Sequence, residues 1–145
     1  MRTFLFVAVI CAVAPSPSPL ASPPPPAYRI VVNAGGPAGE VLDAHFVSDL
    51  FLKKVRTWPS GQSIQPVDLE PSSPVRRRFS EEVLRRPVAA VQAYWQQRIF
   101  SGRDVPPPEL STDQAVMKYV ARNAGAIGYV SASAVAVGAR PVAVR

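Results

Sequence analysis

The chain has 145 residues, a formal net charge of +6 and 48% hydrophobic residues. This length suits one domain, and the apolar content excludes intrinsic disorder over most of it. Cys11 is the only cysteine, so no disulfide can form within the chain. The basic excess favours an anionic partner, but nucleic acid is not expected, because the sequence has no zinc-finger spacing, RNA-binding signature or aromatic-interleaved basic stretch.

The N-terminus is typical of an export signal. Arg2 precedes an unbroken apolar run at residues 4–14, which is too short to span a bilayer of about 30 Å. We predict a signal peptide over residues 1–21, with the cut after Ala14 or after Ala21. Lipoprotein processing at Cys11 fits less well, because Ile10 precedes it where a small residue is wanted.

A proline-rich tract follows the apolar run, and residues 22–27 are expected to be an extended linker. Residues 28–145 should then form one domain. We expect a periplasmic or secreted protein with no stable membrane span once the signal is removed.

The elements of this domain can be predicted in chain order. Residues 28–33 are apolar on both faces, which indicates a buried strand that is either parallel or central in its sheet. A helix is expected from Asp43 to Lys53, with Asp43 as its cap. Residues 64–69 should form a second strand, in which Pro66 marks either an edge or an irregular stretch. The next helix should begin at Ser72 and Ser73 and end near Arg86.

The C-terminal half adds helices and strands. A helix is predicted over residues 88–100, closed by Gly102, and another from Ser111 or Thr112 to Arg122. Residues 123–125 should end that helix with a left-handed cap. Strands are expected at residues 126–130, with a close backbone approach at Gly128, and near residues 140–144. This order predicts a three-layer α/β/α domain.

Four stretches in this order resemble small proteins related to the substrate-binding component of phosphate ABC transporters, which belong to the type II periplasmic-binding-protein superfamily. They are residues 50–69, 72–79, 94–110 and 125–130. The resemblance implies a single lobe of that two-lobed fold. In the full-length relatives phosphate lies between the lobes, held by helix N-termini, hydroxyl groups and an arginine.

The resemblance also points to a ligand site. Ser72 matches the phosphate-contacting serine of the family, and the residues after it appear here as Ser73 and Pro74, so one backbone donor is lost. Asp68 stands where the family has an arginine, and its carboxylate would repel a dianion. The candidate ligand-binding residues are Ser72, Ser73 and Arg76.

Each candidate has an alternative structural role. Ser72 and Ser73 could simply cap the helix, and Arg76 could be solvated like the other arginines of a basic helix face. A second anion-binding turn at residues 101–103 competes with a C-cap role for Gly102. His45, the only histidine, is expected at the surface or the boundary of the first helix.

No cofactor, metal site or catalytic residue is expected, since neither a ligand cluster nor a nucleophile with a paired base can be recognised. We therefore predict a non-enzymatic binding module that takes a small oxyanion such as phosphate or sulfate weakly. The alternative is a domain that has lost ligand binding and instead docks another protein of the cell envelope.

Overall fold

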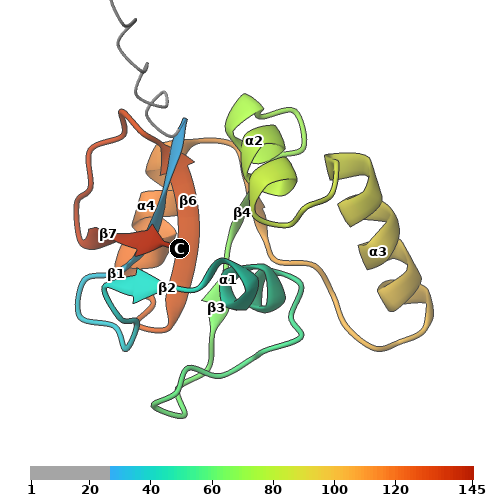
Figure 1. The fold of residues 1–145 in the computed structure, drawn as a ribbon, viewed down its shortest axis with the longest axis horizontal. Helices are drawn as coiled ribbons and strands as arrows, with labels where there is room; N and C mark the ends of the chain where they lie inside the picture. Colours follow the sequence, from blue (N-terminus) through green and yellow to red (C-terminus); the bar gives the residue numbers. More distant parts are fainter. Residues whose placement is uncertain (1–26) are drawn as a thin grey trace, which may run out of the picture.

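The computed structural model describes residues 27–145. The predicted signal peptide, Cys11 and nearly all of the predicted linker lie outside these residues. The described part contains two sheets and four helices (Figure 1).

The main sheet has five strands in the order β2-β7-β1-β6-β3. Strand β1 (Tyr28–Asn33) lies at its centre, between β6 (Ala126–Ser131) and β7 (Ala139–Val144). It is antiparallel to both neighbours. Of the two alternatives for β1, the central position is therefore confirmed and parallel pairing is wrong. Its apolar character comes from being covered on both faces.

The edges of the main sheet are short. Strand β2 (Val41–Leu42) runs parallel to β7, and β3 (Gln65–Pro66) runs parallel to β6. The expected edge position of Pro66 is confirmed, and it fits a residue that has no N–H for a further ladder. The single strand predicted over residues 64–69 is divided, because β4 (Asp68–Leu69) leaves the main sheet and pairs in parallel with β5 (Glu109–Leu110).

All four predicted helices form, and three have side-chain N-caps. They are α1 (Ala44–Phe51), α2 (Pro74–Glu82), α3 (Val88–Phe100) and α4 (Asp113–Arg122). The caps are Asp43, Ser73 and Thr112, each accepting from a backbone N–H in the first turn. Short polar residues that precede a helical pattern of apolar residues therefore mark the N-termini of these three helices correctly.

Two predicted helix ends are wrong. Helix α2 ends at Glu82 rather than near Arg86, and Arg85 beyond it takes the left-handed φ of 54°. After α4, Asn123 is extended at φ −120° rather than left-handed, and its side-chain N–H donates to the carbonyl of Tyr119 at 2.8 Å. Gly102 does adopt a left-handed φ of 64°, as its predicted C-cap role requires.

Adjacent residues of β6 show the layered arrangement, because successive side chains point to opposite faces of a sheet. A Cβ on Gly128 would lie 2.7 Å from Val116 of α4, so the sheet and that helix approach closely, as predicted. On the opposite face, the ring of Tyr129 packs against Phe51 of α1 and Phe79 of α2. The α/β/α architecture is thereby confirmed.

Helix α3 lies at the periphery, next to α2 (Figure 1). Only Val91 and Trp95 of this helix are buried, while Phe100 at its end is 91% exposed. Within residues 27–145, none of the helices has the length and apolar content needed to cross a membrane.

Candidate functional site

The carboxyl ends of β4 and β5 lie side by side, because these two strands are parallel. Helix α2 follows β4 through a turn in which Ser73 N–H donates to Glu70 O at 3.0 Å, and α4 follows β5 almost directly. Two helix N-termini therefore emerge at one edge of the structure. Ligands of open α/β folds commonly bind at this edge, where N-termini present unpaired donors.

The start of α2 holds two of the three predicted ligand residues. The Oγ atom of Ser73 accepts from the N–H of Arg76 at 3.3 Å, so the cap interpretation is confirmed for Ser73. Ser72 lies exposed in the preceding turn. Pro74 occupies the first helical position and has no N–H to offer. Few donors therefore remain for a ligand at this helix start.

Arg76, the third predicted residue, is turned into the protein. The residue is 1% exposed, so its interpretation as a solvated arginine is wrong. Its Nη1 atom lies 2.8 Å from Oδ2 of Asp68 and 2.5 Å from the carbonyl oxygen of Leu69. The next two arginines, Arg77 and Arg78, are exposed, as a solvated basic face requires.

The partner of Arg76 is the carboxylate of Asp68. Asp68 is 3% exposed, and its Oδ1 atom accepts from the hydroxyl of Tyr129 and from the N–H of Leu69. Burial raises the pKa of Asp68 to about 6, although the Arg76 guanidinium opposes that shift. Burial and the neighbouring carboxylate likewise raise the pKa of the Tyr129 hydroxyl.

One further carboxylate completes this group, which we call the Asp68 cluster: Asp68, Arg76, Tyr129 and Glu109. Oε1 of Glu109 lies 3.4 Å from Nη1 of Arg76, and the Glu109 side chain is 39% exposed. The Nε atom of Arg76 is buried and has no hydrogen-bond partner among the described residues. The cluster thus joins a buried ion pair to the surface through Glu109.

Aromatic packing holds the Tyr129 hydroxyl in place. The ring of Phe79 stacks on that of Tyr129 with centroids 3.9 Å apart and planes 9° from parallel. Phe51 contacts the Phe79 ring edge-on and the Tyr129 ring at a tilted angle. Because such side chains sit in a close-packed interior, the hydroxyl has little freedom to leave Asp68.

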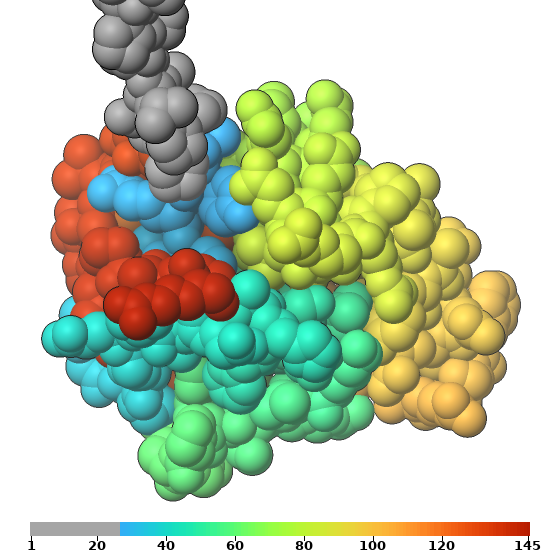
Figure 2. All heavy atoms as spheres, viewed as in Figure 1, coloured from blue at the N-terminus to red at the C-terminus, as the bar shows by residue number. Residues whose placement is uncertain are grey.

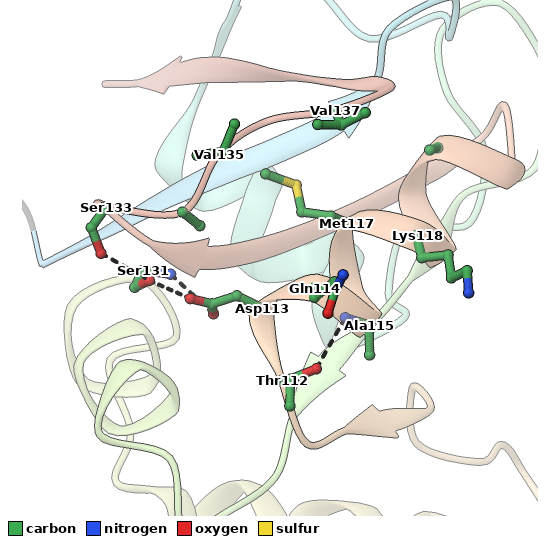
Figure 3. Close-up of a pocket in the computed structure, with 12 residues that line it drawn as sticks. Thr112, Asp113, Gln114, Ala115, Met117, Lys118, Ser131, Ser133, Val135 and Val137 are labelled. Atoms are coloured by element: carbon green, nitrogen blue, oxygen red, sulfur yellow. Dashed lines mark hydrogen bonds between the residues drawn. The ribbon is translucent and has the colours of Figure 1, made fainter.

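The structure also shows a groove of about 920 Å³ that the sequence did not suggest (Figure 3). It lies between α4 and the segment 131–137. At its polar end, the carboxylate of Asp113 accepts from the N–H and the hydroxyl of Ser131. Val135 and Val137, which are 79% and 72% exposed, form an apolar wall. The run of Ser, Ala and Val at residues 131–137 has no spacing that predicts a groove.

The remaining predicted positions have structural roles. The N–H of Gly102 donates to the carbonyl of Ile99 at 3.0 Å, which supports the C-cap interpretation of the turn at residues 101–103. His45 is at the surface, as expected, with Nδ1 3.3 Å from Oδ2 of Asp49. Among residues 27–145, no three His, Cys, Asp or Glu side chains are grouped so that they could hold a metal ion.

Comparison with solved structures places this arrangement in a known fold. A putative phosphate ABC transporter substrate-binding protein from Clostridium perfringens, with bound phosphate, superimposes with a TM-score of 0.64 at 20% identity over 81% of this chain. An ABC-type phosphate transport receptor from Vibrio cholerae gives 0.57 at 18% identity over 81%. PstS from Borrelia burgdorferi gives 0.61 at 8% identity over 82%.

The match covers 44%, 46% and 47% of those three chains, respectively. The chain therefore spans less than half the length of the structures it matches. No protein-family model and no curated protein sequence matches it.

These findings define the fold: the chain has the periplasmic-binding-protein fold, over the extent of about one lobe. Within that fold, its likeness is to phosphate ABC transporter substrate-binding proteins, as the sequence resemblance implied. Identities of 20% and below show the fold alone.

Proposed function

We propose that this chain is an exported, non-enzymatic binding lobe that takes a small oxyanion, phosphate or sulfate, weakly at the start of α2. Ser72, Ser73 and Arg76 are the residues assigned to this site. The observation that carries the proposal is the fold, which is shared with phosphate-binding proteins, one of which holds phosphate in its crystal structure.

The geometry at the start of α2 supports weak rather than tight binding. A helix start favours anions through its unpaired N–H groups and its positive partial charge. Here Pro74 lacks an N–H, and the hydroxyl of Ser73 already accepts from Arg76 N–H. The exposed hydroxyl of Ser72 remains available. A second lobe, from another copy or another protein, would enclose the anion and strengthen binding.

Calorimetric titration of the exported chain with sodium phosphate and sodium sulfate tests the proposal. We expect heat with millimolar affinity, which Ser72→Ala weakens. Ser101→Ala is the matched control, because Ser101 is an exposed serine whose hydroxyl donates to Arg98 O, away from α2. Absence of heat up to tens of millimolar anion, at pH 5 as well as pH 7.5, would remove the oxyanion function.

A second candidate function is favoured by one observation. Arg76 has its charge balanced by Asp68, so the lobe is complete without an anion. The domain would then dock another envelope protein. Retention of a defined envelope protein by the immobilised domain, unaffected by phosphate, is expected in that case. An empty pull-down from envelope extract would count against it.

A further inference from the structure

We propose that Asp68 is the internal anion of this lobe, and that an external oxyanion reaches Arg76 only when Asp68 has taken up a proton. This inference rests on the proposed oxyanion function and adds its regulation. It assigns to Asp68 the control of whether an external oxyanion can reach Arg76.

The contacts of the Asp68 carboxylate carry the first step. It accepts from three donors: Nη1 of Arg76, the hydroxyl of Tyr129 and the N–H of Leu69. A guanidinium, a hydroxyl and a backbone amide are also the donors that a bound oxyanion uses. The carboxylate therefore occupies the place of a ligand at a site built from nearly fully buried groups.

The charges around Arg76 carry the second step. The groups acting on Asp68 are Arg76 from α2, Tyr129 from β6 and Glu109 from β5. With both carboxylates ionised, the cluster has one positive and two negative charges, and an incoming anion is repelled. Protonation of Asp68 leaves Arg76 opposed by Glu109 alone, so the cluster loses its net negative charge and repels an incoming anion less.

The third step concerns how an anion could reach Arg76 and which of its N–H groups is free to bind it. Glu109 is 39% exposed and contacts the same Nη1 atom, so the guanidinium lies just behind a surface side chain. The Nε atom of Arg76 is buried without a partner, which leaves an N–H for a ligand that enters there. Since burial raises the pKa of Asp68 to about 6, an anion should gain access to Arg76 at mildly acidic pH.

Sulfate is the probe that tests this coupling, because it keeps its charge between pH 5 and pH 7.5. We expect its association constant to fall by about tenfold per pH unit above pH 6, as uptake of one proton requires. Titrations at pH 7 in two buffers with different heats of ionisation should show about one proton bound per sulfate.

Two variants locate the proton. Asp68→Asn should bind sulfate with an affinity that no longer depends on pH. Glu109→Gln is the matched control, since it removes a carboxylate from the same guanidinium but should keep the pH dependence. If Asp68→Asn does not fold, as judged by circular dichroism, the number of protons that the unaltered chain binds per sulfate, together with the pH dependence of Glu109→Gln, tests the proposal instead.

The outcomes separate the two proposals. Sulfate binding that is independent of pH in the unaltered chain, or still pH-dependent in folded Asp68→Asn, overturns the role of Asp68 and leaves the oxyanion function standing. No binding of sulfate or phosphate at pH 5 overturns both.

Discussion

The Nη1 atom of Arg76 lies 2.8 Å from Oδ2 of Asp68, and both side chains are at least 96% buried. Removing two charges from water costs several kcal/mol for each ion, and the attraction between them offsets that cost only when other hydrogen bonds are also made. Here Tyr129 and the backbone of Leu69 provide those bonds. Removing the charge and hydrogen bonds of either side chain should therefore destabilise the folded state.

Breaking the pair should destabilise the domain. Asp68→Ala leaves the buried guanidinium without its main counter-charge and the Tyr129 hydroxyl without its acceptor, and it should lower the free energy of unfolding by about 3–5 kcal/mol. Arg76→Met should cost less at pH 5 than at pH 7, because Asp68 can then become neutral. The double variant should recover much of the loss. Urea unfolding measures all three.

The control for this series is an exposed pair. Nη1 of Arg78 lies 3.4 Å from Oε1 of Glu82, with side chains 62% and 47% exposed. Glu82→Gln should change stability by less than about 0.5 kcal/mol. An Asp68→Ala variant as stable as Glu82→Gln would show that the buried pair contributes no coupling.

Stability should also depend on pH through Asp68. Its pKa is about 6 in the folded state and about 3.9 in an unfolded chain, so the folded state binds more protons between these values. The contribution is then fully present below about pH 4 and is lost as pH rises through 6. A shift of about two units corresponds to about 3 kcal/mol.

Melting temperatures of the unaltered chain and of Asp68→Asn between pH 4 and pH 7.5 check this. Other carboxylates contribute to both proteins alike, so the difference between the two curves isolates Asp68. Because Asn cannot ionise, the unaltered chain should lose stability relative to Asp68→Asn as pH rises from 4 to 7. Parallel curves would mean that Asp68 keeps an ordinary pKa in the fold.

The sequence predicted the helices better than the cluster, and the reason is physical. Local signals such as the caps at Asp43 and Thr112 depend on neighbouring residues, so they can be read directly. The contact between Asp68 and Tyr129 spans 61 positions and is created by the pairing of β3 with β6. Asp68 could be recognised as a departure from the pattern that the sequence resembles, but the partner that balances its charge could not.

The same limit applies to strand direction. An apolar run such as residues 28–33 shows that both faces are covered, but the direction of the neighbouring strands is set by distant parts of the chain. The groove beside α4 depends in the same way on segment 131–137, which carries no pattern of its own.

Substitutions at the start of α2 should separate a structural serine from a ligand serine. Ser73→Ala removes the cap of α2 and should lower the free energy of unfolding by about 0.5–2 kcal/mol. Ser72→Ala, at an exposed turn position, should change stability by less than about 0.5 kcal/mol. Chemical unfolding compares the two. Equal losses would indicate that Ser72 shares the cap.

The contact between β6 and α4 should tolerate no side chain at Gly128. A Cβ there would lie 2.7 Å from Cγ1 of Val116 and 2.8 Å from Cγ1 of Val67, closer than carbon atoms approach. Val116 and Val67 are both fully buried, so neither can move aside without shifting its element. Gly128→Ala should therefore lower the free energy of unfolding by at least about 1–3 kcal/mol.

The matched control for Gly128 is Gly35, where the nearest atom to an added Cβ is Oδ1 of Asn33 at 3.7 Å, an ordinary contact. Gly35→Ala should be neutral or slightly stabilising, because alanine reduces the freedom of the unfolded chain. Thermal unfolding of the two variants side by side measures the difference. If Gly128→Ala and Gly35→Ala unfold at the same temperature, helix α4 does not pack on β6 at this separation, and this part of the layered arrangement is wrong.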